Sequence, residues 1–184
     1  MSDSELAPGL LVAMPQLLDP NFHRAVVFMV EHDEHGSFGL VINRDTEFTC
    51  ERLCDNLDME WRGDPERLVS WGGPVQPEHG WLLVGDEASD HEDLVRVTDG
   101  VRFSRSPAAL RAMARRPVPR LNIFLGYAGW EAGQLLDELI EGAWIVAPAS
   151  PDLLFDQPRD SLWEAALRGL GIDPATLVQT SGVN

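Results

Sequence analysis

Two apolar runs joined by a short polar loop near the start of the chain constrain its fold most. Residues 25–31 (AVVFMVE) and 38–43 (FGLVIN) have the length of strands and are rich in β-branched and aromatic side chains. The loop between them, residues 32–37 (HDEHGS), has the polar residues and the glycine that favour a turn. The sequence therefore predicts a β-hairpin at this point.

Strand-length runs recur along the rest of the chain, and segments with helical periodicity are few. We expect further strands at 10–14, 68–71, 80–84, 94–98, 101–105, 121–126 and 143–147. We expect helices at 49–57, at 107–115 behind the N-cap Ser106, from Trp130 to Glu141, and at 161–170. Because strands and helices are grouped and do not alternate, the sequence predicts an α+β fold with about eight strands and three or four helices.

The length of the chain and its even composition predict a single domain. The chain has 184 residues, and it contains no internal repeat, linker or low-complexity segment. A chain of this length buries enough surface to fold without disulfides or a structural metal. We expect one domain over residues 1–184, with loose segments at 1–8 and 176–184.

Features at three places in the sequence predict a cytoplasmic protein. The N-terminal segment is acidic and lacks the basic stretch of a signal peptide. The longest apolar run, residues 25–30, is far too short to span a membrane. Cys50 and Cys54 lie four residues apart with no neighbouring Cys/His pair, so we expect two small core residues and no zinc site or disulfide.

The charge of the chain is strongly acidic but unevenly distributed. The formal net charge is −16, and all 14 basic residues are arginines. Most of such a surface repels nucleic acid. Residues 101–120, in contrast, form an arginine-rich segment without any acid, so it either neutralises nearby carboxylates of the chain, or binds an acidic protein, or binds nucleic acid. Its arginines, which are our candidate partner-binding residues, are Arg102, Arg105, Arg111, Arg115, Arg116 and Arg120.

The stretch GYAGWEAGQ, residues 126–134, is expected at a junction between a strand and a helix. It lacks the lysine of a P-loop and the G-x-G-x-x-G spacing of a dinucleotide-binding loop. We therefore expect Gly126 and Gly129 to let the backbone turn, and Tyr127 and Trp130 to pack against the sheet. The alternative is a loop that contacts a ligand with the free N–H groups of a helix start.

Several polar residues at the ends of the first strands can converge if those strands pair. A histidine and an aspartate can act as acid and base, and an arginine can hold an anion. The turn at residues 126–130 can close the same space. The resulting candidate ligand pocket comprises Asp19, Arg24, His32, Asn43, Arg44, Gly126, Tyr127, Gly129 and Trp130.

Residues 32–35 (HDEH) place four potential metal ligands in one loop. Two histidines three apart share a face only on a helix, whereas in a hairpin loop the side chains point in different directions. We interpret this loop as a surface turn, and we expect neither a metal nor a cofactor.

Five motifs in order resemble the YqgE/AlgH family of bacterial cytosolic proteins over residues 8–172. They are residues 13–44 (AMPQLLDPNFHRAVVFMVEHDEHGSFGLVINR), 72–75 (GGPV), 125–135 (LGYAGWEAGQL), 142–149 (GAWIVAPA) and 162–171 (LWEAALRGLG). The resemblance implies a compact α+β fold on a mixed, largely antiparallel and partly barrel-like sheet. Where the family reads Gly-Gln-Leu-Glu, this chain has Leu136 at the last position, while Glu138 keeps its family counterpart.

The resemblance implies no settled enzymatic activity, and the AlgH branch has carried the label of a transcriptional regulator. The sequence contains no G-x-S-x-G elbow and no paired Cys–His nucleophile signal. We expect a non-enzymatic regulatory or protein-binding protein. The alternatives are a small-ligand sensor or enzyme with a pocket near Asp19, Arg24, His32 and the 126–130 turn, and nucleic-acid binding through residues 101–120.

Overall fold

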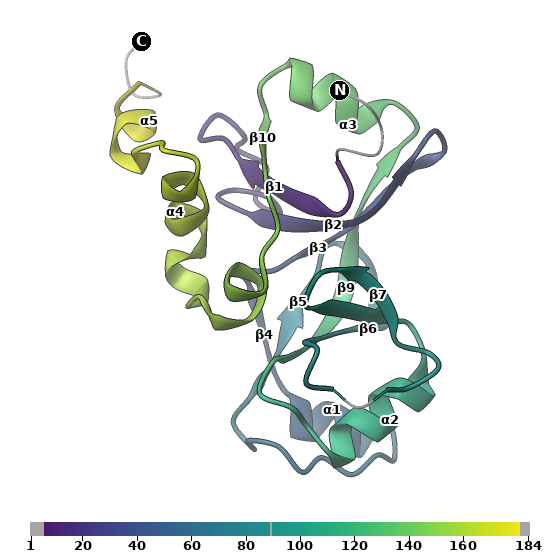
Figure 1. The fold of residues 1–184 in the computed structure, drawn as a ribbon. Coiled ribbons are helices and arrows are strands. Elements are labelled where there is room, and N and C mark those ends of the chain that lie inside the picture. The colour runs from purple at the N-terminus through teal and green to yellow at the C-terminus, as the bar shows by residue number, and fades with distance from the viewer. Residues whose placement is uncertain (1–5, 89, 181–184) are drawn as a thin grey trace.

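The computed structural model describes residues 6–88 and 90–180, and they form a curled sheet flanked by helices (Figure 1). The strands are β1 (Gly9–Ala13), β2 (Val26–Asp33), β3 (Gly36–Val41), β4 (Asp45–Thr49), β5 (Leu68–Trp71), β6 (Val75–Val84), β7 (Val95–Thr98), β8 (Val101–Ser104), β9 (Leu121–Glu131) and β10 (Trp144–Ala147). The helices are α1 (Cys50–Asn56), α2 (Pro107–Arg115), α3 (Gln134–Ile140), the π-helical turn η2 (Asp152–Asp156), α4 (Arg159–Gly169) and α5 (Pro174–Thr180).

The strands of the described residues pair into one sheet with the order β10-β1-β2-β3-β9-β6-β8-β7. Strand β5 adds to β9 in parallel, and β4 pairs with β5; the pairs along the main path are antiparallel. The sheet curls into a half-barrel. The predicted α+β class with a mixed, largely antiparallel, partly barrel-like sheet is therefore confirmed.

The long strand β9 connects two regions of the molecule. One region holds β10, β1, β2 and β3 with α3 above them, and the other holds β6, β7 and β8 with α1 and α2 below (Figure 1). Helices α4 and α5 lie along one side of the molecule (Figure 1). Within the described ranges, no helix is both long and apolar enough to cross a membrane.

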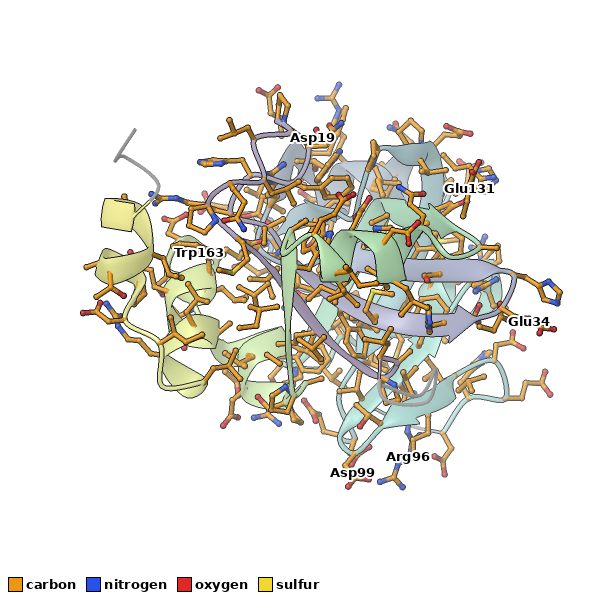
Figure 2. The ribbon with its side chains drawn as sticks, turned by 90° about the horizontal axis from the view of Figure 1, so that it is seen from above. Asp19, Glu34, Arg96, Asp99, Glu131 and Trp163 are labelled. Carbon is orange, nitrogen blue, oxygen red and sulfur yellow. The ribbon has the colours of Figure 1, made fainter. Side chains whose placement is uncertain are left out.

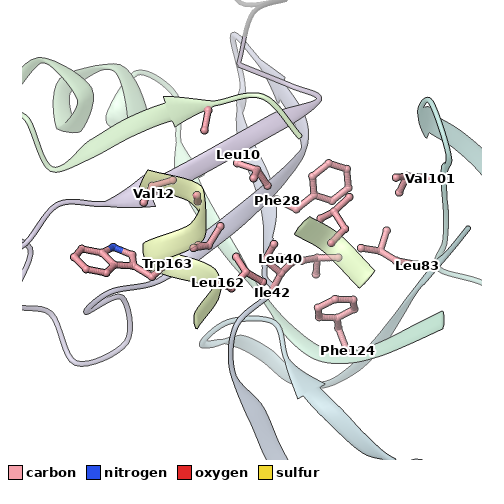
Figure 3. Packing of buried hydrophobic residues seen from close by; sticks show 14 of the residues in the cluster. Leu10, Val12, Phe28, Leu40, Ile42, Leu83, Val101, Phe124, Leu162 and Trp163 are labelled. Atoms are coloured by element: carbon pink, nitrogen blue, oxygen red, sulfur yellow. The ribbon is translucent and has the colours of Figure 1, made fainter. Parts of the chain in front are cut away.

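Apolar side chains cover both faces of the curled sheet. On one face, Leu162 and Trp163 of α4 pack toward Leu10 and Phe28 of the sheet (Figure 3). The Trp163 indole N–H donates to the carbonyl of Ala13 at 2.8 Å, so this buried polar group is satisfied. Burying each large side chain of this kind contributes about 1.5–3 kcal/mol, which is what holds α4 to the sheet.

Two hairpins and the capped helix α2 form from residues that are close together in the sequence. Strands β2 and β3 pair through His32 and Ser37, so the first predicted hairpin is confirmed. The Asp99-Gly100 turn joins β7 to β8 with Gly100 at φ +76°. The Ser106 hydroxyl accepts from the N–H groups of Ala108 and Ala109 at the start of α2, as expected of an N-cap.

The prediction that residues 126–130 end a strand and open a helix is wrong. Strand β9 continues to Glu131, and α3 begins only at Gln134, after Gly133 with φ +79°. The continuation is fixed by pairing with β3, in which Gly129 lies opposite Phe38 and Trp130 opposite Ser37. Pairing with a strand distant in sequence thus overrode the local glycine signal.

The structure also contains elements that the sequence patterns did not predict, namely β4, η2 and α5. Helix α5 covers residues 174–180, part of the segment expected to be loose, and Leu177 on it packs against the core near Ile172. Leu6, in the other segment expected to be loose, is only 1% exposed. The expectations for 1–5 and 181–184 fall outside the described residues.

Candidate functional site

Four of the five polar residues expected to converge hold the turn that precedes β2. Arg44 donates to the carbonyls of Pro20, Asn21 and His23 at 3.0, 2.5 and 2.6 Å. Burial lowers the pKa of Arg44, and the nearby Asp19 carboxylate opposes this shift. The guanidinium therefore acts as a clamp on the backbone of this turn.

Arg24 and Asn43 complete the same structure. Arg24 has φ +53° and places its guanidinium 5.0 Å from the centre of the Trp163 ring. Asn43 donates to the Arg24 carbonyl at 2.9 Å and accepts from the Val26 N–H at 2.9 Å. A non-glycine residue at positive φ is stabilised here by neighbours that bond its backbone. The polar side chains of this group therefore hold the backbone of the turn by hydrogen bonds.

His32 lies away from this group. It is six residues beyond Val26 on β2, which corresponds to about 20 Å along a strand. Its Nδ1 atom lies 2.6 Å from the Ser37 hydroxyl. The structure therefore does not bring His32 together with Asp19, Arg24 and Arg44, and the expected acid–base set is not assembled.

The side chains of the 126–130 segment lie on two different faces of the sheet. Tyr127 packs against Phe38 and Trp81, with ring centres 4.8 and 5.7 Å away. Trp130 lies in the cluster on the other face, and its indole N–H donates to Glu138 at 2.9 Å. Alternation along β9 separates the two rings, so they do not line one site.

Gly126 of the same segment supports a packing role. It has φ +75°, and a Cβ atom built on it would overlap the carbonyl oxygen of Gly73. Gly129 is not in the left-handed region, and a Cβ there would meet the Tyr127 ring at 3.1 Å. The backbone crossing at Gly73 and Gly126 therefore requires glycine.

The predicted loop over residues 32–37 is shorter than expected: only Glu34 and His35 form the turn, and His32 lies on β2. Glu34 at its tip points away from the body of the protein (Figure 2), and the side chains of Glu34 and His35 are more than four-fifths exposed. The His35 N–H donates to the Asp33 carboxylate, as in many polar turns. In the part of the chain that the structure describes, no group of three or more histidine, cysteine or acidic residues could hold a metal ion.

The arginine-rich segment divides into two sets. In the first set, Arg102 pairs with Asp90 at 2.8 Å, and Arg105 pairs with Glu31 at 3.0 Å. Arg120 pairs with Asp152 and Asp156, and its hydrogen bond lowers the pKa of Asp156. These three arginines neutralise carboxylates of the chain.

The second set lies on α2 and just after it, and comprises Arg111, Arg115 and Arg116. All three are exposed, and among the described residues none of them has a carboxylate within ion-pair distance. Arg111 donates only to the backbone carbonyl of Asp58, at 3.1 Å. Arg111 and Arg115 are one helical turn apart, so they share a face of α2.

An apolar groove of about 250 Å³ is lined by Pro107 and Leu110 of α2, and its charged lining residues are Glu78 and Arg105. Arg111 lies next to the groove through its bond to Asp58, whereas Arg115 and Arg116 do not line it. Leu57, at its edge, is 45% exposed, and Arg111 follows Leu110 directly on α2. The main apolar side chains that line the groove are Leu53, Leu57, Met59, Trp81, Leu110 and Leu125. We call this groove, together with Arg111, Arg115 and Arg116, the α2 surface.

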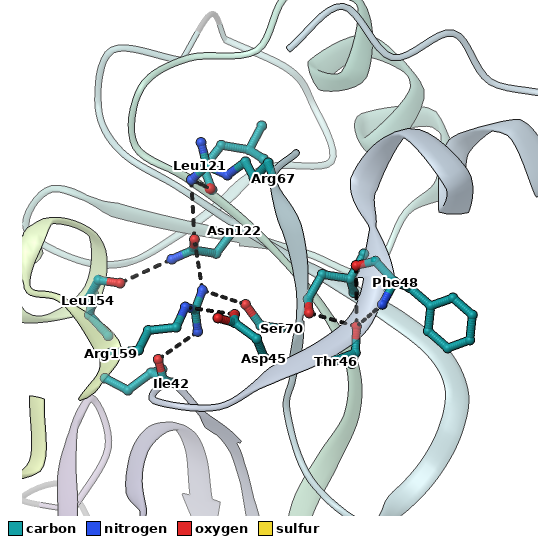
Figure 4. A network of polar contacts seen from close by, with 11 residues as sticks. Ile42, Asp45, Thr46, Phe48, Arg67, Ser70, Leu121, Asn122, Leu154 and Arg159 are labelled. Atoms are coloured by element: carbon teal, nitrogen blue, oxygen red, sulfur yellow. Dashed lines mark hydrogen bonds and ion pairs between the residues drawn. The ribbon is translucent and has the colours of Figure 1, made fainter. Parts of the chain in front are cut away.

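A second, polar pocket of about 420 Å³ lies between β4, β5, the start of β9 and the start of α4 (Figure 4). Arg67 and Arg159 reach it from distant parts of the sequence, which is why no local motif revealed it. The one available signal is Arg159 directly after Pro158 at the head of an amphipathic helix. We call it the Arg67–Arg159 pocket.

Buried thiols lie behind this pocket. Burial raises the pKa of Cys50 to about 12 and also raises that of Cys54. Both cysteines are buried in a hydrophobic cluster, which confirms that they are core residues of α1. A neutral, buried thiol is a poor nucleophile, so these side chains line the interior without supplying chemistry.

Comparisons with known proteins agree with this fold. The family profile described as AlgH-like matches residues 10–175. A UPF0301 protein of Myxococcus xanthus is 44% identical over 97% of this chain and 98% of its own length. One of Magnetococcus marinus is 40% identical, with coverage of 98% and 97%.

Solved structures extend the comparison. The solution structure of the AlgH protein from Pseudomonas aeruginosa has a TM-score of 0.77 and 35% identity, covering 100% of this chain and 98% of that one. A crystal structure of a Corynebacterium diphtheriae protein has a TM-score of 0.73 at 24% identity, covering 100% and 95%, and shows the fold alone. The names of these relatives state no activity. The chain belongs to the AlgH-like family.

Proposed function

We propose that this protein is a non-enzymatic regulatory protein that binds another protein through the α2 surface. The observation that carries the proposal is the set of three exposed arginines on and just after α2, without carboxylate partners in the described chain, together with an apolar groove that Leu110 of the same helix lines. In a chain of net charge −16, arginines left unpaired in this way are available to an external acid. Arginine and large apolar side chains are also the residues that concentrate binding energy in protein interfaces.

The chemistry of the surface defines the partner. A groove of about 250 Å³ holds one or two apolar side chains, and Arg111 and Arg115 of α2 can each form a bidentate pair with a carboxylate. The partner is therefore an acidic segment of a protein that presents an apolar anchor. Nucleic acid fits less well, because the rest of the molecule repels phosphate backbones over distances of about one Debye length.

A regulatory role in the cytoplasm is consistent with this surface. Binding of a partner requires no acid, base or nucleophile. Of the two residues suggested as acid and base, Asp19 accepts from the Asn21 N–H and His32 contacts the Ser37 hydroxyl, in a different part of the fold. Two reduced cysteines in the core suit a reducing compartment. The transcription-regulator label carried by the family also suits a protein that acts by contact.

The proposal is tested with the double charge reversal Arg111→Glu/Arg115→Glu. The matched control is Arg96→Glu/Arg168→Glu, which changes the same charge at two exposed side chains outside α2. Each tagged protein is incubated with an extract of its native host, and recovered proteins are then purified and titrated by calorimetry. We expect a partner that binds the wild type and the control but binds the α2 variant at least tenfold more weakly.

Two results would overturn the proposal. In the first, every recovered partner binds all three proteins equally well. In the second, fluorescence anisotropy at physiological salt detects submicromolar binding of duplex DNA or RNA that only the α2 variant loses, which assigns the surface to nucleic acid.

A further inference from the structure

The Arg67–Arg159 pocket brings two guanidinium groups to one acceptor. The side-chain oxygen of Asn122 accepts from Arg67 at 3.3 Å and from Arg159 at 3.4 Å (Figure 4). The amide of Asn122 donates to the Leu154 carbonyl at 3.1 Å, which fixes its orientation with the oxygen toward the arginines. The two positive groups are therefore held close together by a buried, neutral side chain.

Two guanidiniums and two carboxylates line the pocket, and both carboxylates already have an arginine partner. Asp45 pairs with Arg159 at 2.9 Å, whereas Arg67 has no ion pair within the described ranges. Asp156 also lines the pocket, but it pairs with Arg120. Burial lowers the pKa of Arg159, an effect that a bound anion would oppose.

Arg67 retains unused hydrogen-bond donors. Its Nη2 group donates to the Leu121 carbonyl and to Asn122, while its Nε and Nη1 groups have no acceptor among residues 6–88 and 90–180. The first turn of α4 opens onto the same space through Gln157, Pro158 and Arg159, and no side chain caps it. Unpaired guanidinium donors beside a helix N-terminus are the elements that bind oxyanions in proteins.

We propose that the Arg67–Arg159 pocket binds the oxyanion group, phosphate or carboxylate, of a small molecule. The volume of about 420 Å³ suits a metabolite-sized ligand and is far too small for a folded partner. Arg67 supplies the free donors, and Arg159 and Asn122 fix its position. The pocket lies apart from the α2 surface, so this inference does not depend on the proposed function.

A different cavity also contains arginines, but their pairing differs from that in the Arg67–Arg159 pocket. The cavity of about 640 Å³ beside β7 and β8 also contains two arginines, Arg96 and Arg105. Each of them is paired, with Asp99 and Glu31 respectively, and Glu92 adds a further negative charge. Three carboxylates and two guanidiniums line that cavity, and both guanidiniums are paired, so an anion is not expected there.

The experiment is a titration of the full-length protein with inorganic phosphate and with succinate, in separate arms. Sodium chloride at matched ionic strength is the reference, and the melting temperature and the heat of binding are measured. We expect a saturable rise in melting temperature with at least one anion and none with chloride. The arm that responds identifies a phosphate or a carboxylate as the preferred group.

Arg67→Gln replaces the guanidinium by a neutral amide, which still donates hydrogen bonds but carries no charge, so we expect it to weaken binding at least tenfold. Arg62→Gln, which changes an exposed arginine outside the pocket, should bind like the wild type. Absence of saturable binding of both anions to the wild type, or equal binding by Arg67→Gln, would overturn the inference.

A measurement on the wild type covers the case in which Arg67→Gln does not fold. In two-dimensional NMR spectra, the arginine Nε–H signals are followed during the phosphate and succinate titrations. Binding in the pocket should move the signals of Arg67 and Arg159 with one common saturation curve, while the exposed Arg96 and Arg168 remain in place. Uniform shifts of all arginines would contradict a defined site.

Discussion

The α2 surface and the Arg67–Arg159 pocket both present guanidinium groups in an acidic protein, but they differ in what holds those groups. On α2, the arginines project from a helix whose other face packs through Met113 and Ala114. In the pocket, Arg159 bonds to Asp45, to the Ile42 carbonyl and to the Ser70 hydroxyl. The first set is free to change partners, whereas the second is part of the fold.

This difference shows that density of charge in the sequence does not locate a binding site. Half of the arginine-rich segment, including Arg102 and Arg120, neutralises nearby acids. Arg67 and Arg159 are isolated in the sequence and meet only because β5 and the start of α4 meet. The role of each arginine depends on the groups that its guanidinium contacts, and not on how many other arginines lie near it in the sequence.

The largest effect that separates the two regions is expected from Arg159→Gln. The substitution leaves Asp45 without its ion pair and removes bonds to two other segments. The Asp45 side chain is 35% exposed, so solvent screens the pair and we expect a loss below the about 3–5 kcal/mol of a fully buried pair, about 2–3 kcal/mol with the lost hydrogen bonds included. Urea unfolding measures the loss, with Arg168→Gln on the exposed side of α4 as the control. A loss below about 1 kcal/mol would show that Arg159 is not structural.

A second, smaller loss of stability is expected from Gly126→Ala. Gly126 lies on β9, the strand that lines both the pocket and the groove. Asn122 of β9 lines the pocket and Leu125 lines the groove. Gly126→Ala forces a residue with φ +75° against the Gly73 carbonyl, and such strain costs roughly 1–3 kcal/mol.

Gly129→Ala is the matched control for this prediction. It lacks the positive φ and meets only the edge of the Tyr127 ring, at 3.1 Å, so we expect a smaller loss in thermal and urea unfolding. Equal losses of stability for both variants would mean that the close approach to the Gly73 backbone is not the reason why position 126 requires glycine. Loss of anion binding by Gly126→Ala alone would show that the crossing also positions the pocket.

The sequence predicts the parts of this fold that depend on neighbouring residues. The strands on either side of Asp99-Gly100 and the Ser106 cap depend on residues within a few positions, and the sequence predicts both. The continuation of β9 through Trp130 depends on pairing with β3, which periodicity along one segment does not report. The same reason explains the candidate site, because Arg159 is placed by tertiary contacts with Asp45 and Asn122.

The smallest effect on stability is expected from the charge reversal on the α2 surface. Arg111→Glu/Arg115→Glu removes one hydrogen bond, from Arg111 to the Asp58 carbonyl, and no ion pair among the described residues. Repulsion from the exposed Glu60, whose pKa is lowered mainly by its hydrogen bond with Arg62, is screened by solvent. We expect urea unfolding to change by no more than about 0.5 kcal/mol and circular dichroism to be unchanged. If this variant instead lost as much stability as Arg159→Gln, the arginines of α2 would be structural, and the contrast between a free and a fixed set would fail. An unchanged stability makes any loss of partner binding in the same variant a direct property of the surface.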